Sequence, residues 1–241
     1  MPTLILFDLG HTLLYLTEDW KRVFERALQS VPAALESAGY PGDAVQAAAR
    51  LRQVLERYYA ERDKDLNEVQ AAQTFRKAFK EFAGRKKQDR FAQAALESFY
   101  RTTQAHWLPE PDAAPTMQAL RGRGVRLGVV SNAANDQDVQ TLVDQAGLRP
   151  YLEIVLSSAA VGRRKPAPLI FRTALRALEA QAGEAWMVGD TYTADILGAR
   201  NAGLRPIWIT RRVMNLPPVD LVPDREPVER IKSLAELLDL I

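Results

Sequence analysis

Several polar residues of the kinds that bind metal ions and anions stand at or shortly after the ends of short apolar runs. They are Asp8, Ser131, Asn132, Lys165, Asp190 and Asp195. Carboxylates that lie close together need a cation to neutralise them, and a hard dication such as Mg²⁺ prefers oxygen ligands. A lysine beside hydroxyl and amide donors suits a phosphate group. Brought together, these side chains would form a site for Mg²⁺-assisted phosphoryl transfer.

Each of these residues also has an ordinary structural explanation when it is taken singly. Asp8 could cap a turn, and Ser131 with Asn132 could start a turn before a helix. Asp190 could cap a helix N-terminus, and Asp195 could be a first-turn acid favoured by the helix dipole. The lysine could be a solvated loop charge. Their joint occurrence after successive apolar runs favours the functional interpretation.

The apolar runs that precede these residues are typical of strands buried on both faces, because they show little alternation of apolar and polar residues. They cover residues 4–7, 125–130, 154–156, 186–188 and 206–209. Helical patterns at 137–146, 167–180 and 192–202 separate the later runs, and a closing amphipathic helix is predicted over 229–241. The pattern predicts an α/β fold with a doubly wound, parallel, Rossmann-like sheet. In such a sheet ligands bind beyond the carboxyl ends of the strands.

A long helical segment interrupts this alternation after the first strand. From about Thr17 to His106 the sequence shows helical patterns rich in Ala, Arg, Gln and Glu, and no convincing strand. A crossover between parallel strands needs only about a dozen residues. We therefore predict an inserted all-helical domain over residues 16–109, within a core domain formed by residues 1–15 and 110–241.

Composition limits the classes of protein to which the chain can belong. It has 241 residues and no cysteine, which excludes disulfides and thiol chemistry. It shows no apolar window as long as a membrane span and no signal peptide, so we expect a cytoplasmic protein without a membrane partner. The net charge of +2 does not imply a nucleic-acid partner. The oligomeric state stays open.

The charge is unevenly distributed along the chain. Residues 50–101 hold 13 Lys and Arg against 8 Asp and Glu, a net charge of +5. This excess slightly favours anionic ligands, although a solvated helical surface is by itself a sufficient explanation.

Four motifs give the chain a resemblance to the haloacid dehalogenase superfamily. They are "LILFDLGHTL", "LGVVSNA", "GRRKPAPLIF" and "WMVGDTYTADILGARNAGL". They occur in the order of that family and span residues 3 to 204. The third motif is similar to the Lys-Pro segment of the phosphatase branch, and the helical insert resembles a C1-type cap.

The resemblance implies a nucleophile and a metal site. Asp8 would attack phosphorus and give an aspartyl-phosphate. Mg²⁺ would be held by Asp8, by the backbone carbonyl of Gly10 and by Asp190, with Asp195 close to the ion or bound through water. The substrate would be a small phosphorylated molecule.

The resemblance also implies how the phosphoryl group would be bound. Ser131 and Asn132 would donate hydrogen bonds to its oxygens. Lys165 would neutralise the developing charge and keep Asp8 and the phosphate in register. Two anions must approach each other in this reaction, and Mg²⁺ with Lys165 would remove their repulsion.

Gly10 departs from the pattern of the family. Its phosphatases usually carry, two residues after the nucleophile, an Asp that protonates the leaving oxygen and then activates water. General acid–base catalysis contributes about 10²–10⁴-fold, so alkyl phosphates should react more slowly by about that factor. Aryl phosphates, acyl phosphates and sugar 1-phosphates have leaving groups that are stable as anions and should suffer less.

Several explanations of Gly10 stay open. Some phosphatase subgroups of the family carry Gly here, with water or a cap residue in place of the acid. His11 could supply the proton, or it could pack beside the turn. The chain could instead be a weak or inactive protein that binds a phospho-ligand and regulates. A haloacid dehalogenase is disfavoured, because such enzymes carry an aromatic residue at the position of Gly10, and a phosphomutase would itself need the acid.

Overall fold

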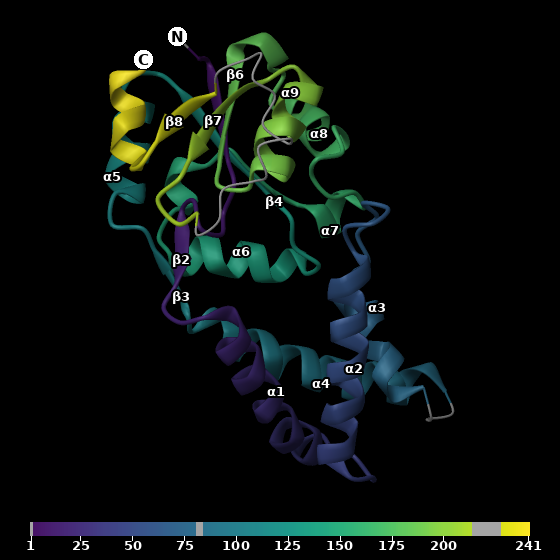
Figure 1. Cartoon of the computed structure of the whole chain (residues 1–241). Helices are drawn as coiled ribbons and strands as arrows, with labels where there is room; N and C mark the ends of the chain where they lie inside the picture. Colours follow the sequence, from purple (N-terminus) through teal and green to yellow (C-terminus); the bar gives the residue numbers. More distant parts are fainter. Residues whose placement is uncertain (1, 81–83, 214–227) are drawn as a thin grey trace. The chain divides into compact units, whose positions relative to one another are not determined.

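The computed structural model describes residues 2–80, 84–213 and 228–241 (Figure 1). The chain divides into two compact units. The first, here called the core unit, comprises Met1–Tyr15 and Pro109–Ile241, and the second, the helical unit, comprises Leu16–Leu108. The core unit is therefore formed by two separate stretches of chain, and the helical unit is an insertion between them.

The core unit is built on a six-stranded sheet in which every neighbouring pair is parallel. In spatial order the strands are β5 (Ile154–Ser157), β4 (Arg126–Ser131), β1 (Leu4–Phe7), β6 (Ala185–Gly189), β7 (Arg205–Ile209) and β8 (Glu229–Ile231). Strand order reverses around β1, as in a doubly wound sheet. The predicted α/β class and parallel sheet are confirmed.

Strand β1 occupies the middle of the sheet. Its Phe7 lies in register with Val129 of β4 and with Val188 of β6. All its four side chains are fully buried, which explains the unbroken apolar run in the sequence. Asp8, the residue that follows β1, therefore lies at the centre of the carboxyl edge of the sheet.

Helices connect the strands and bury apolar side chains against the sheet. They are α5 (Ala113–Gly122), α6 (Asp136–Gln145), α7 (Ser158–Val161), α8 (Leu169–Ala177) and α9 (Gly198–Ala202). Phe171 and Ile170 of α8 pack in one cluster with Leu4, Leu6 and Met187 of the central strands. The helix predicted over 192–202 begins as a π-helical turn, Tyr192–Leu197, before α9. Short 3₁₀ turns occur at Arg149–Tyr151 and Ala182–Glu184.

The predicted closing helix over 229–241 is wrong in its type. Residues Glu229–Ile231 form β8 at the edge of the sheet, and Leu234–Asp239 form a 3₁₀ helix. Of the four residues expected to point inward from that helix, Ile231, Leu234 and Leu237 are buried and Leu238 is half-buried. The spacing of three residues between Leu234 and Leu237 suits the 3.0 residues per turn of a 3₁₀ helix as well as it suits an α-helix.

The described residues of the helical unit form four α-helices, which are α1 (Trp20–Ser37), α2 (Ala44–Glu61), α3 (Ala71–Arg76) and α4 (Arg85–Gln104). A short 3₁₀ turn, Lys77–Phe79, follows α3. Phe99 meets the rings of Phe24 and Phe75 edge-on, at centroid distances of 5.8 and 5.6 Å. Edge-to-face pairs of this kind stabilise a core beyond their buried area. No helix among the described residues is long and apolar enough to cross a membrane.

A small two-stranded sheet, which the sequence did not predict, lies where the chain passes between the units. It pairs β2 (Leu14–Leu16) with β3 (Trp107–Pro109). On the core side of this crossing, the backbone N–H of Glu110 donates to the carbonyl of Leu13 at 2.9 Å. The outgoing and returning chains are therefore joined to each other directly.

Candidate active site

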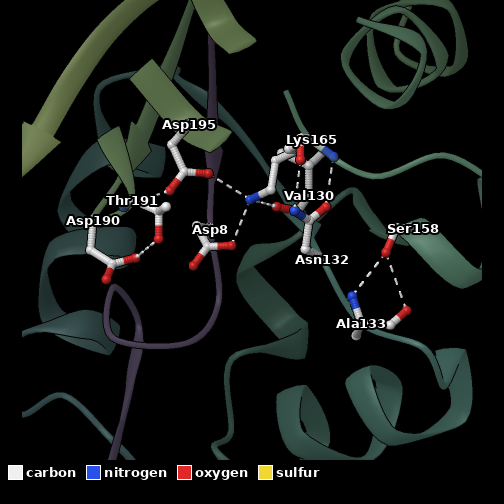
Figure 2. Close-up of polar contacts among 9 residues, drawn as sticks. All are labelled: Asp8, Val130, Asn132, Ala133, Ser158, Lys165, Asp190, Thr191 and Asp195. Atoms are coloured by element: carbon white, nitrogen blue, oxygen red, sulfur yellow. Dashed lines mark hydrogen bonds and ion pairs between the residues drawn. The ribbon is translucent and has the colours of Figure 1, made fainter. Parts of the chain in front are cut away.

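Lys165 is the centre of a polar cluster at the carboxyl edge of the core sheet (Figure 2). Its Nζ donates to Asp8 Oδ1 at 2.6 Å, to Asp195 Oδ1 at 2.7 Å and to the carbonyl oxygen of Val130 at 2.8 Å. The residue is only 2% exposed. An ammonium group has three protons, and all three are used within the core unit.

Asp8 owes its place to the end of β1. Its backbone N–H donates to the carbonyl of Val188 on the neighbouring β6 at 2.9 Å, so the ladder between the strands continues up to this residue. The side chain is 9% exposed. Since Lys165 binds Oδ1, the other carboxylate oxygen is not held by the lysine.

Three carboxylates converge beside this lysine. Ligand oxygens of Asp8, Asp190 and Asp195 lie within 4.8 Å of one another. One lysine cannot balance three acids, and an excess of carboxylate in a small buried volume suits a hard divalent cation such as Mg²⁺. The donor set therefore fits the metal that the sequence predicted.

The crowding of negative charge shifts the pKa values of the two acids that follow β6. Burial, followed by the charges of Asp8 and Asp195, raises the pKa of Asp190 to about 8. Burial also raises the pKa of Asp195 to about 6, although Lys165 opposes the shift. For Lys165 burial lowers the pKa, but the charges of Asp195 and Asp8 outweigh it and the pKa is raised. The lysine is thus held as a cation.

Asn132 anchors the backbone of Lys165 through both ends of its amide group. Its Oδ1 accepts from the backbone N–H of Lys165 at 2.7 Å, and its Nδ2 donates to the carbonyl of the same residue at 3.0 Å (Figure 2). This is a positioning role, which the sequence did not predict. A contact of Asn132 with a phosphoryl group stays a prediction.

Ser131 ends β4 beside these residues and is 7% exposed. The chain that follows it is held in place by Ser158, whose Oγ accepts from the backbone N–H of Ala133 at 2.9 Å. Ser131 is thus placed at the carboxyl edge of the sheet, where its predicted contact with a ligand would have to be made.

Gly189 is a required part of the site that the sequence reasoning missed. A Cβ atom on this residue would lie 2.3 Å from Cγ of Asp195, which is far inside van der Waals contact. Asp195 is 1% exposed, and its Oδ2 accepts from the backbone N–H of Thr191 at 3.0 Å. Both oxygens of Asp195 are therefore engaged, one by Thr191 and one by Lys165. The only sequence signal was the glycine directly before Asp190.

The turn after Asp8 carries Gly10 and His11. Gly10 forms an isolated bridge with Leu14, and His11 has a positive φ of 59°. Burial is the largest influence on His11 and lowers its pKa, while the charge of Asp8 opposes this shift. His11 is therefore close enough to Asp8 to feel its charge.

Comparison with known proteins identifies the family. The model of the haloacid dehalogenase-like hydrolases matches residues 2–203. The chain is 36% identical over 163 residues to a phosphoserine phosphatase of Thermus thermophilus, a match that covers 68% of this chain and 61% of that protein. It is 29% identical over 219 residues to a glyceraldehyde 3-phosphate phosphatase of Methanopyrus kandleri, covering 84% and 92% of the two chains. The chain belongs to the haloacid dehalogenase-like hydrolase family.

A solved structure supports the same assignment. The 2-haloacid dehalogenase of Pseudomonas syringae pv. tomato superposes with a TM-score of 0.74 at 25% identity, over 100% of this chain and 98% of the other. The family thus includes relatives with different named activities. The chain spans about three-fifths of the length of the phosphoserine phosphatase that it matches.

A substitution at Gly189 tests whether the close approach of Asp195 is essential. We expect Gly189→Ala to displace Asp195 and to lower the free energy of unfolding by about 1–3 kcal/mol, as overpacking does. Urea unfolding followed by circular dichroism measures the change. Gly183→Ala is the matched control, because a Cβ there meets nothing within 4 Å. Equal midpoints for the two variants would contradict the argument.

The raised pKa of Asp190 predicts how stability depends on pH and on Mg²⁺. Between 3.8 and about 8 the unfolded chain loses this proton while the folded protein keeps it, so the stability of the metal-free protein falls as pH rises. Mg²⁺ binds the ionised carboxylates, so its addition should raise the melting temperature more at about pH 8 than at about pH 6. Thermal melts with and without Mg²⁺ check this. Asp190→Asn should shrink the Mg²⁺-induced shift, and a larger shift at the lower pH would refute the prediction.

Proposed function

We propose that the protein is a Mg²⁺-dependent phosphatase that hydrolyses a small phosphorylated metabolite through an aspartyl-phosphate on Asp8. The observation that carries the proposal is the buried contact of Lys165 with both Asp8 and Asp195. A buried lysine against a carboxylate at the end of the central strand is suited to phosphoryl transfer, in which an anion must approach an anion.

Asp8 and Lys165 would have different roles in the reaction. A carboxylate oxygen of Asp8 would attack phosphorus, and the bond between phosphorus and the leaving oxygen would break. Water would then attack the aspartyl-phosphate, break its bond to Asp8 and release inorganic phosphate. Lys165 holds Asp8 in place throughout and offsets the negative charge.

The metal ion would be held by Asp8, by the carbonyl of Gly10 and by Asp190. When bound, Mg²⁺ would supply positive charge to the transferring phosphoryl group. Asp195 would contribute chiefly through Lys165, since both of its oxygens already accept hydrogen bonds. Ser131, at the end of β4, would donate to a phosphoryl oxygen.

The relatives support the class of substrate. Two of them are named for phosphoserine and for glyceraldehyde 3-phosphate, both small phosphorylated molecules. The structural similarity to a 2-haloacid dehalogenase suggests dehalogenation as a second candidate activity. We favour the phosphatase, because Gly10 lacks the aromatic side chain expected of such a dehalogenase, and because a cluster of three carboxylates calls for a metal ion.

Gly10 favours one alternative function. In this alternative the protein is a regulatory protein that binds a phospho-ligand and is catalytically weak or inactive. With no acid at this position, the leaving oxygen has no built-in proton donor there. The retained cluster of Asp8, Lys165, Asp190 and Asp195 favours the enzyme, since a chain that had lost catalysis would have no reason to keep the whole set.

Replacement of the nucleophile separates the two possibilities. Asp8→Asn keeps the shape of the side chain and should lower Mg²⁺-dependent phosphate release by roughly 10³-fold or more. The assay is a panel of phosphate esters, including phosphoserine and glyceraldehyde 3-phosphate, with and without Mg²⁺. Asp144→Asn is the control, because Asp144 is a surface residue whose ion pair in the described part of the chain is with Arg149. Binding without turnover across the panel would leave the regulatory alternative standing.

Restoring the missing acid tests the role of Gly10. Gly10 is not among the described glycines that have a positive φ, so its backbone conformation is one that a residue with a side chain can adopt. Gly10→Asp should raise kcat on alkyl phosphates, by up to about 10²–10⁴-fold, and should change kcat on aryl phosphates much less. Gly10→Asn supplies the same bulk without the acid. No gain from a folded Gly10→Asp variant would show that the acid is not what limits turnover.

A further inference from the structure

We propose that the helical unit carries an anion-binding cleft of its own, for a small molecule with at least two negative charges. The cleft encloses about 770 Å³, and the described residues that line it all fall within 54–80. This volume is in the range of natural small-molecule sites. No core-unit residue that the structure describes lines it, so the proposal is independent of the chemistry at Asp8.

Positive charge gathers around this cleft. Five cations line it against two acids, Glu61 and Asp65. The cations are Arg57, Arg62, Lys64, Lys77 and Lys80. Both oxygens of Asp65 are already occupied, because they accept from the backbone N–H and the side-chain amide of Asn67 at 3.0 and 2.8 Å. The cleft therefore has a net positive charge that its own acids do not cancel.

The cations of the cleft differ from others in the same unit in having few partners. Among the described residues, Arg57, Lys64, Lys77 and Lys80 make no ion pair within 4 Å. Other arginines are paired, as Arg52 is with Glu25. Like charges that gather around a concave surface without acids raise the local concentration of anions.

The interior of the cleft also contains polar groups without hydrogen-bond partners. Within the described part of the chain, Thr74 Oγ1 and Arg62 Nε are buried and have no hydrogen-bond partner, although Arg62 Nε lies 3.7 Å from Asp63 Oδ2 as an ion pair. Thr74 is only 2% exposed, and both side chains line the cleft. A buried polar atom left unpaired costs about 1–3 kcal/mol, and in native proteins such atoms often mark a bound ion or water.

Side chains that contact one another form part of the cleft wall and could hold a ligand in one orientation. The guanidinium carbon of Arg62 stands 4.8 Å from the ring centroid of Tyr59. Tyr58 donates its hydroxyl to Glu68, and Val54 and Val69 add apolar surface. A ligand with two anionic groups on a short apolar skeleton matches these features. Part of the positive charge of residues 50–101 thus lies around a concave site.

Titration of the whole protein with inorganic pyrophosphate tests the proposal. The measurement is isothermal titration calorimetry in EDTA, so that Mg²⁺ does not draw the anion to the carboxylates of the core unit. We expect saturable binding, and shifts of the backbone amide resonances of Thr74 and Lys77. The double variant Lys77→Gln/Lys80→Gln should weaken binding at least about tenfold, since charge-assisted hydrogen bonds are strong.

The matched control removes the same charge from elsewhere in the helical unit. Lys86→Gln/Lys87→Gln changes two exposed lysines of α4 that do not line the cleft, and it should alter binding by less than about twofold. Equal weakening by the two double variants would show diffuse attraction and overturn the proposal. Absence of saturable binding, or of shifts at Thr74 and Lys77, would overturn it as well. Because no turnover is measured, failure of the phosphatase proposal leaves this test intact.

Discussion

The buried ammonium of Lys165 is the constraint on which the candidate active site depends. Removing an ion from water costs several kcal/mol even after the protein relaxes. Here the cost is offset by two carboxylates at 2.6 and 2.7 Å and by the carbonyl of Val130. The converse also holds, because without the lysine three acids would crowd together with no counter-charge. The lysine and the acids therefore each lower the cost of burying the other.

The fold supplies this arrangement by fixing backbone before side chains. Asp8 is tied by its N–H to β6, and Lys165 is tied by N–H and carbonyl to the single side chain of Asn132. The backbone N–H of Asp195 donates to the carbonyl of Thr191 at 2.8 Å. Each charged group therefore arrives with its main chain already restrained, which lowers the entropy lost on forming the ion pairs.

Much of this could be predicted from the sequence, and the limits have physical reasons. Strands buried on both faces appear as local apolar runs, and the carboxyl edges of parallel strands lie together, so Asp8, Lys165 and Asp190 could be assigned to one edge. The clamp by Asn132 could not, because its partner is backbone 33 positions away. Strands of three residues, such as β2 and β8, are too short to show a period.

The need for glycine at position 189 could not be predicted from the sequence for a similar reason. A glycine at the end of a strand has many explanations in a sequence, among them a tight turn or a bulge. What makes this one necessary is a side chain six positions later that folds back over it. The π-helical turn Tyr192–Leu197 carries Asp195, and π-helical turns occur frequently at functional sites. The need for glycine is therefore a property of the site rather than of the strand.

The full engagement of Lys165 has a consequence for the choice of substrate. All three of its protons are given to Asp8, Asp195 and Val130, so it has none to offer a leaving oxygen unless one of these bonds breaks. Gly10 has no side chain that could serve, and burial lowers the pKa of His11, which disfavours its protonated form. A leaving group that is stable as an anion avoids the problem, because it can depart before it is protonated. By this argument an acyl phosphate, an aryl phosphate or a sugar 1-phosphate suits the site better than a simple alkyl ester.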